Sequence, residues 1–429
     1  MSSFKSFLCL AGLLAVVAVQ PVSAAPTWGL VESSENGVPV LMNPAIPRDG
    51  AGIVSAVQQW RLGADETNDP LLGLPKDAVV DGQGNTYLLD SVLSTVFVIS
   101  PSGDIVRQIG KEGDGPGEFR NASQLVFMPD GSLGILEMMP GQIVCLAPGG
   151  DPRPGFHPGG DGHTGMQHLQ RVAVDGDQVI LGGIRTSVDS AGATVNHSLV
   201  RHRADGSKAV VVRERKEVQA GGRVSIKLDG GEESFTDNWV LTKDGDLIVF
   251  PRPFEYRLEY YDSRGKLTRI VGRTYETLRR SDEQLAAARK QAEAMSARFS
   301  GVQMAVEERA RDISAVFPRP DGSLWVASSQ GSRARAKGSL GVFDVIDPAG
   351  RFVRTVRIDG VDYDDARDDF TIVGDRLYVF KEALKAPSSV STSGGAGMTI
   401  MMIQGGSDVD EDDDGEARPF EVVCYSLGA

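Results

Sequence analysis

The chain has 429 residues, of which 41% are hydrophobic and 24% are charged, and it contains 51 glycines. This composition excludes a disordered chain, a coiled coil and a collagen, and it suits a globular protein with many tight turns. The formal net charge of −14 argues against nucleic acid as a partner and favours a basic or cationic one.

The N-terminus has the features of a signal peptide. Lys5 precedes an apolar run from Phe7 to Val19, and small residues follow at positions 23–25. This run is shorter than the roughly 18 apolar residues that cross a bilayer. We therefore expect a signal peptide over residues 1–24, an N-terminal extension over 25–49, and a secreted or periplasmic protein without a membrane span. A buried N-terminal helix is the alternative.

The rest of the chain repeats a unit of two short strands joined by a glycine turn. These turns lie at Gly84, Gly131, Gly245 and Gly322, with weaker copies at Gly176 and Gly374. A second series of turns, at Gly103, Gly150, Gly206, Gly265 and Gly350, leads from a third strand to a fourth. Turn-punctuated repeats of about 45 residues with four strands each predict an all-β fold, a six-bladed β-propeller over residues 50–429.

The sixth unit ends at residues 422–425 without a fourth strand behind it. Residues 54–62, which precede the first unit, have the pattern of a lone fourth strand. We therefore expect the N-terminal segment to complete the sixth blade and so close the ring.

One inter-blade segment resembles a known family. Residues 113–119, Gly-Asp-Gly-Pro-Gly-Glu-Phe, are similar to the inter-blade signature of NHL-repeat six-bladed propellers, and Asn85 with residues 87–90 is similar to the second strand of that family. The resemblance covers about residues 74–150. Members include binding modules and a few enzymes, so the fold alone does not choose a function.

Long insertions are concentrated on one face of the predicted disc. The loops between second and third strands are long at 183–196, 329–340 and 381–419, and the inter-blade loops are long at 151–168, 214–234 and 273–312. The opposite face keeps tight turns, so we expect the functional site on the insertion face.

The insertion 273–312, between blades four and five, contains a predicted helix. Ser281 and Gln284 form the pattern of a capping box, and an apolar stripe of Leu285, Ala288, Ala292, Met295 and Phe299 precedes Gly301. A lid or buttress across the disc is the expected role, with a partner-binding helix as the alternative.

Acidic residues form two clusters, at 359–369 and at 408–416. The second cluster fits a calcium loop, with Asp410, Asp412 and Asp414 at alternate positions and Glu421 at the twelfth. Pro419 and the strand after it do not suit an EF-hand. We therefore favour a flexible acidic loop over residues 386–418, and calcium is the one candidate cofactor.

Cysteine and histidine chemistry has little support in the sequence. Cys145 and Cys424 occupy equivalent third strands of blades two and six, farther apart than the roughly 7 Å Cα limit for a disulfide, so both are expected to be free. His157, His163 and His168 share one inter-blade loop. Zinc lyases with NHL-like folds take histidines from different blades, so a surface loop is the favoured interpretation. No catalytic residue is assigned.

Charged residues near the inner ends of the second strands are the ligand-binding candidates: Asp90, Glu137, Arg185, Arg252, Arg333, Arg335 and Lys381. Carboxylates beside guanidinium groups can bind a polar or anionic ligand, and inter-blade salt bridges are the equal alternative. We predict a monomeric scaffold that binds a protein or a small polar ligand. The alternative is a metal-dependent propeller lyase or hydrolase at the channel mouth.

Overall fold

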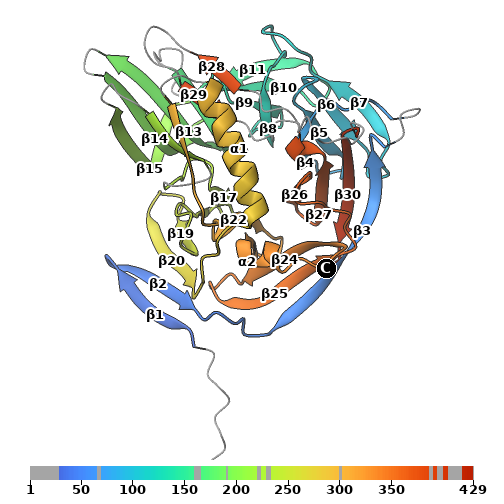
Figure 1. Ribbon diagram of the computed structural model, residues 1–429. Helices are drawn as coiled ribbons and strands as arrows, with labels where there is room; N and C mark the ends of the chain where they lie inside the picture. The colour runs from blue at the N-terminus through green and yellow to red at the C-terminus, as the bar shows by residue number, and fades with distance from the viewer. Residues whose placement is uncertain are drawn as a thin grey trace, which may run out of the picture.

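The computed structural model describes residues 29–64, 69–158, 166–189, 192–219, 224–228, 233–298, 302–385, 390–393, 400–403 and 418–428. Within these residues the protein is predominantly β, and antiparallel groups of strands surround a common centre (Figure 1). This arrangement is that of a β-propeller. We call the groups blades and number them in chain order.

Blades one to three are separate four-stranded sheets. Blade one consists of β4 (Pro75–Val80), β5 (Thr86–Asp90), β6 (Thr95–Ile99) and β7 (Ile105–Ile109). Blade two consists of β8 (Ala122–Phe127), β9 (Leu133–Glu137), β10 (Gln142–Leu146) and β11 (Pro152–Phe156). Blade three consists of β12 (Met166–Asp175), β13 (Gln178–Asp189), β14 (Gly192–His202) and β15 (Lys208–Gln219).

Blades four to six share their sheets with N-terminal strands. Blade four consists of β17 (Trp239–Leu241), β18 (Leu247–Val249), β19 (Arg257–Tyr261) and β20 (Leu267–Arg273). Blade five consists of β22 (Ile313–Pro318), β23 (Leu324–Ser328), β24 (Ser339–Ile346) and β25 (Phe352–Asp359). Blade six contains β26 (Asp369–Val373), β27 (Arg376–Lys381) and β30 (Glu421–Leu427).

The N-terminal strands β1 (Val31–Glu35), β2 (Val38–Asn43) and β3 (Ala51–Leu62) run along the outer edges of these three blades. We call residues 31–62 the N-terminal strap. β2 pairs in parallel with β20, and the first half of β3 pairs in parallel with β25. The second half of β3 pairs antiparallel with β30, beside which it runs in Figure 1. The predicted closure of blade six is therefore confirmed for residues 56–62, whereas residues 54 and 55 of the expected strand pair with β25 of blade five.

The extension expected over residues 25–49 is only partly outside the blades, because β1 and β2 belong to the sheet of blade four. Asn36 and Gly37 join them with φ angles of 51° and 80°, the positive values that a two-residue hairpin turn needs. The local hairpin signal was present in the sequence. The pairing of this hairpin with β20, however, joins residues far apart in the chain. Such long-range pairing leaves no local pattern in the sequence.

The glycine turns on one face share one geometry. In the first, the Gly84 N–H donates to the Asp81 carbonyl and the Asp81 N–H to the Asn85 carbonyl, each at 3.0 Å, with Gly84 at φ +84°. The same pair of bonds closes the turns at Gly103, Gly131, Gly150, Gly206, Gly245, Gly265, Gly322 and Gly350. The positive φ explains the glycine in each repeat.

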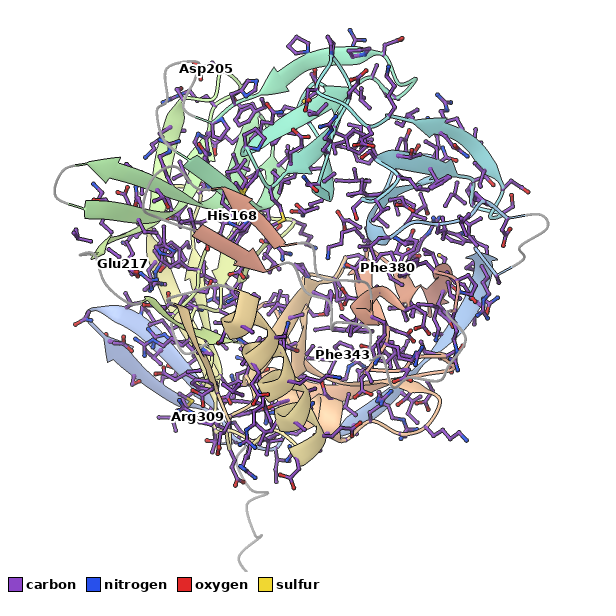
Figure 2. All side chains as sticks on the ribbon, turned by 45° about the horizontal axis from the view of Figure 1, so that its top comes forward. His168, Asp205, Glu217, Arg309, Phe343 and Phe380 are labelled. Atoms are coloured by element: carbon purple, nitrogen blue, oxygen red, sulfur yellow. The ribbon has the colours of Figure 1, made fainter. Side chains whose placement is uncertain are left out.

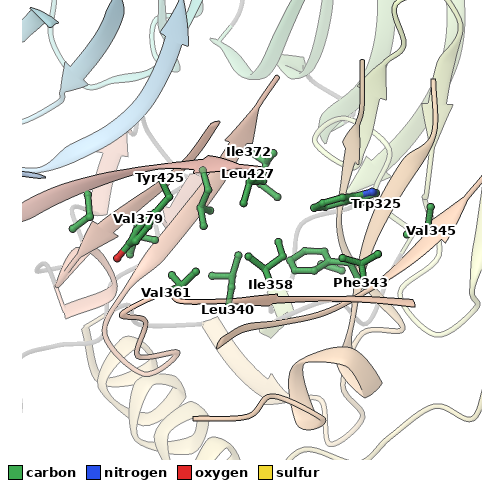
Figure 3. Close-up of a cluster of buried hydrophobic side chains, with 14 residues drawn as sticks. Trp325, Leu340, Phe343, Val345, Ile358, Val361, Ile372, Val379, Tyr425 and Leu427 are labelled. Atoms are coloured by element: carbon green, nitrogen blue, oxygen red, sulfur yellow. The ribbon is translucent and has the colours of Figure 1, made fainter. Parts of the chain in front are cut away.

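The hydrophobic core consists of layers between neighbouring blades. Figure 3 shows the layer between blades five and six, in which Trp325 and Phe343 of blade five face Val379 and Tyr425 of blade six. Phe119, from the segment that resembles the NHL signature, is fully buried between blades one and two. Each blade is therefore stabilised mainly by its two neighbours.

Helix α1 (Asp282–Arg298) begins as the sequence predicts. The Ser281 hydroxyl accepts from the Gln284 N–H at 3.1 Å, and the Gln284 side chain accepts from the Ser281 N–H at 3.0 Å. The stripe residues Leu285, Ala288 and Ala292 are buried, whereas the Met295 side chain, Phe299 and Gly301 lie outside the described residues. After α1, β21 (Val302–Val306) pairs in parallel with β16 (Val224–Leu228).

Several segments expected to be loops contain strands instead. The predicted loop 151–168 includes β11 and the start of β12, and the predicted loop 214–234 includes the end of β15 and β16. Residues 183–196 largely extend β13 and β14 into a long hairpin, because their alternating residues continue the pairing of the blade. Within the acidic loop, β28 (Val390–Ser393) pairs with β29 (Ile400–Ile403); the apolar β29 is a strand signal that the expectation of a flexible loop ignored. None of the helices in the described ranges is long and apolar enough to cross a bilayer.

Candidate functional site

A pocket of about 280 Å³ lies between blades five and six. Its walls come from β22, β23 and β24 of blade five, from the short helix α2 (Ser329–Arg333) with the loop after it, and from β26 with the loop before it. Its lining residues include Phe317, Ser332, Arg335, Phe343, Tyr363, Asp365, Asp369 and Phe370. The pocket includes part of the predicted insertion 329–340.

The pocket lies where two neighbouring blades are packed loosely. Of the neighbouring innermost strands in the described ranges, β22 and β26 pack least closely. Helix α2 contributes Ser332 to the lining. It lies against β24 because residue 331 is glycine: a Cβ there would stand 2.0 Å from the Val342 carbonyl oxygen. The Ser328 hydroxyl caps α2 by accepting from the Gly331 N–H at 3.2 Å.

Four aromatic residues contribute to the wall of the pocket. The Phe370 ring lies 5.6 Å from the Phe317 ring, 6.2 Å from the Phe343 ring and 5.6 Å from the Tyr363 ring, measured between centroids. Phe343, labelled in Figures 2 and 3, belongs to blade five, whereas Phe370 belongs to blade six. The two blades thus contribute to one aromatic cluster, with ring separations in the favourable range.

The Arg335 guanidinium is held by groups of the loop before β26. It donates to the Tyr363 carbonyl at 2.9 Å and to the Asp365 carboxylate at 2.5 Å, and it lies 5.7 Å from the centre of the Tyr363 ring. Burial raises the pKa of the Tyr363 hydroxyl, so that group stays neutral at ordinary pH. Arg335 therefore closes one side of the pocket with its charge already neutralised by Asp365.

Asp369 is the second carboxylate of the pocket, and it has a different environment. Its carboxylate accepts only the adjacent Phe370 N–H, at 2.8 Å, and within the described ranges it forms no ion pair. The surrounding protein raises its pKa by desolvation, whereas the charge of Lys76 on β4 lowers it. Asp369 is nevertheless exposed to solvent, as expected of a group at the wall of a cavity.

Asp90 and Glu137 are buried and hold loops. The Asp90 carboxylate accepts from the N–H groups of Gly73 at 2.7 Å and Leu74 at 3.0 Å, and from two N–H groups in the turn after it. The Glu137 carboxylate accepts from the Arg120 N–H at 2.6 Å and from the Gln142 amide at 2.5 Å. Neither carboxylate faces a guanidinium group, contrary to the arrangement expected from the sequence, because unsatisfied loop N–H groups are nearer.

The predicted basic residues do not meet at one site. Arg185 donates to the Gln167 side chain at 2.7 Å and Arg252 to Glu255 at 2.8 Å. Arg333 donates to the Arg279 carbonyl at 2.5 Å, which joins α2 to the segment before α1. Lys381 donates to the buried Asp368 carboxylate at 2.6 Å. Of the seven ligand-binding candidates, only Arg335 lines the pocket.

The calcium candidates Asp410, Asp412 and Asp414 lie outside the described residues. Glu421 begins β30, and its carboxylate forms an ion pair with Arg61 of the N-terminal strap. Across the described ranges, no group of three or more His, Cys, Asp or Glu side chains is arranged to hold a metal ion.

Sequence reasoning missed Phe317, Tyr363 and Asp369. Phe317 and Asp369 lie on the first strands of blades five and six, and first-strand residues of the other blades gave no indication of a site. Tyr363 lies inside an acidic cluster, in which its ring did not stand out. The one available signal was the position of that cluster, next to a first strand and on the insertion face.

A second group of charges lies on the innermost strands of blades one and three. The Asp77 carboxylate accepts a hydrogen bond from the Leu125 N–H at 2.8 Å. Burial raises the pKa of Asp77 to about 6, and this effect is larger than the lowering by the nearby charge of Arg171. His168 lies on β12 rather than in the predicted loop (Figure 2). Burial lowers the pKa of His168 to about 4.

No protein-family model matches the chain, and no curated protein matches it in sequence. Similar solved structures include a catalytically inactive virginiamycin B lyase from Staphylococcus aureus, which is 12% identical in sequence. The match covers 86% of this chain and 99% of that one, with a TM-score of 0.40. A DUF4221 family member from Bacteroides vulgatus is 10% identical, and the match covers 88% of this chain and 99% of that one, with a TM-score of 0.44. The calcium-binding protein regucalcin from Agrobacterium tumefaciens is 11% identical, and the match covers 77% of this chain and 87% of that one, with a TM-score of 0.34. Similarities at this level do not indicate what the present protein binds or catalyses.

Proposed function

We propose that this protein is a secreted or periplasmic, six-bladed, NHL-like β-propeller that acts as a binding scaffold. Its ligand site is the pocket between blades five and six, on the face that carries the insertions. The observation that supports this proposal is the convergence of aromatic rings with Arg335, Asp365 and Asp369 around one cavity. A largely apolar cavity with a few convergent polar groups is the usual form of a ligand site.

The placement of the long segments supports the same face. α1 with its flanking segments and the long connections of blades three, five and six stand opposite the glycine turns. α1, the helical insertion between blades four and five, lies across this face in Figure 1. Loops that a rigid scaffold holds on one side commonly form its binding site.

Blocking the pocket tests the proposal. Ser332 is exposed on α2 and lines the cavity, so Ser332→Trp fills the pocket without disturbing the core. We use 2-phenylethanol and 2-phenylethylamine as single-ring probes, with binding followed by saturation-transfer NMR. Both probes are expected to bind the native protein, and Ser332→Trp is expected to abolish that binding. Arg252→Ala, an exposed change outside the lining residues, is the control and should leave binding unchanged.

Binding of neither probe, or binding that Ser332→Trp leaves intact, would overturn the assignment of this pocket. Ala315→Phe, from the β22 wall, is the second blocking variant. Circular dichroism and the melting temperature of each variant show whether it is folded.

Metal dependence separates the scaffold from the enzymatic alternative. We propose that the acidic loop is not a calcium site, and we expect the melting temperature to stay the same in Ca²⁺, Zn²⁺ or EDTA. A ligand that binds only the native state raises the melting temperature. A chelator-reversible rise that Asp412→Ala removes would instead favour a metal-dependent protein.

A further inference from the structure

We infer that the pocket between blades five and six selects a small organic cation, an amine on a single-ring apolar body. The amine pairs with the Asp369 carboxylate, and the body packs against Phe317, Phe343 and Phe370. This inference rests on the proposed function, since it specifies the ligand of the same site. It also replaces the anionic ligand that the loop arginines suggested in the sequence.

The charges of the lining residues indicate the sign of the ligand. Arg335 is the one cation among them, and its guanidinium is already paired with Asp365 at 2.5 Å. Asp369 forms no ion pair in the described part of the chain. A bound anion would therefore have to break the Arg335 pair and also approach Asp369. A bound cation gains a charge-assisted hydrogen bond to Asp369 and breaks nothing.

The Asp369 carboxylate is partly desolvated by the surrounding protein, although the residue remains exposed to solvent. Desolvation is the largest influence on its pKa, which is raised, so the carboxylate has lost part of its hydration without gaining a cationic partner. An amine at hydrogen-bond distance would supply that partner.

The aromatic wall suits the rest of the ligand. The Phe370 ring contacts the rings of Phe317, Phe343 and Tyr363. Aromatic faces attract cations as well as apolar groups. The volume of about 280 Å³ is just below the usual range for ligand pockets, roughly 300–1,000 Å³. It therefore suits one ring with a short amine arm rather than a larger compound.

One cation opposes the ligand. Lys76, on the innermost strand of blade one, lowers the pKa of Asp369 by its charge but forms no ion pair with it in the described ranges. Lys76 must weaken the binding of a second cation near Asp369. Its removal is therefore expected to tighten amine binding, an effect that a merely apolar pocket would not show.

The experiment compares isosteric probes by isothermal titration calorimetry with the full chain. We use 2-phenylethylamine, the neutral 2-phenylethanol and the anionic phenylacetate. The amine is expected to bind about tenfold more tightly than the alcohol, since a hydrogen bond to a charged group is stronger than one between neutral groups. Phenylacetate is expected to bind more weakly than the alcohol.

Asp369→Asn should reduce the affinity for the amine to that for the alcohol, and Lys76→Met should raise it. Asp359→Asn is the matched control: it removes the same charge from the same acidic cluster, but Asp359 is paired with Arg357 at 2.6 Å. It should leave amine binding within about twofold, because exposed charges act weakly over distance. Asp369→Glu keeps the charge and should preserve the preference if Asp369→Asn does not fold.

Equal affinities for amine and alcohol would overturn this inference, as would an amine affinity that Asp369→Asn does not change. If Ser332→Trp still blocks both probes in that case, the proposed binding site stands and only its ligand class is wrong. If no probe binds in a Ser332→Trp-sensitive way, the proposed function fails as well.

Discussion

The side-chain carbonyl of Asn43 accepts a hydrogen bond from the backbone N–H of Phe352 at 2.9 Å. The amide of the same side chain donates to the carbonyls of Gly272 and Gly350, each at 3.0 Å. Asn43 ends β2 in the N-terminal strap and is buried. It therefore connects blade four to blade five at a point where the strap passes from one to the other.

Asn43→Ala is expected to lower the free energy of unfolding by about 2–3 kcal/mol, because it leaves buried backbone groups without partners. Urea denaturation measures this change. Gln59→Ala is the control: its amide bonds Val57 and Ser426 at an exposed position of the same strap, and a change there should cost less than about 0.5 kcal/mol. Equal losses for both variants would show that Asn43 does not connect the blades.

Trp60 is the main apolar anchor of the ring closure. It is 6% exposed, and its ring lies 6.0 Å from that of Tyr378 on β27. Trp60→Ala should lower the free energy of unfolding by about 3–5 kcal/mol through the cavity that it leaves. Val57→Ala, at a 57% exposed position of the same strand, should change it by less than about 0.5 kcal/mol. A small loss for Trp60→Ala, measured by chemical denaturation, would contradict the importance of this closure.

The thiols of Cys145 and Cys424 are expected to be unreactive in the native protein. Both are free and buried, and burial raises their pKa values to about 11 and about 12. Because the thiolate is the reactive form, thiol reagents at pH 8 should label them only after denaturation. Peptide mass spectrometry checks this. A disulfide between them, or rapid native labelling, would contradict the assigned blade positions.

His168 should make the protein less stable as pH falls. Its folded pKa of about 4 lies below the ordinary value of 6.5, so between these pH values the unfolded chain binds a proton that the folded chain does not. The free energy of unfolding therefore decreases as pH falls through this window, by about 2–3 kcal/mol for a shift of this size on a half-buried group. His168→Gln should remove this loss, measured by urea denaturation at pH 7 and pH 4.5.

Asp77 provides a control of opposite sign. Its folded pKa of about 6 lies above the ordinary value of 3.8, so the folded chain binds the proton first. Its burial penalty is present at neutral pH and is relieved as pH falls. Asp77→Asn should therefore steepen the acid destabilisation that His168→Gln reduces. A change in the same direction for both variants would contradict these environments.

Much of the fold follows from local patterns. The glycine turns, the strands they join and the capping box of Ser281 and Gln284 each depend on residues within a few positions of one another. The lone strand that contains Trp60 was also recognisable, since its pattern matched that of the fourth strands and one blade lacked such a strand. Backbone geometry at short range determines these features, so the sequence by itself was sufficient for them.

Local sequence patterns did not determine the proposed binding site. Arg335 was a candidate from its loop, but its pairing with Asp365 and the unpaired state of Asp369 depend on how two blades meet. Asp90 had the same residue type as Asp369, yet it satisfies loop N–H groups. Only the tertiary structure decided which carboxylate faces a cavity, because desolvation and pairing are set by atoms that packing brings together from distant parts of the chain.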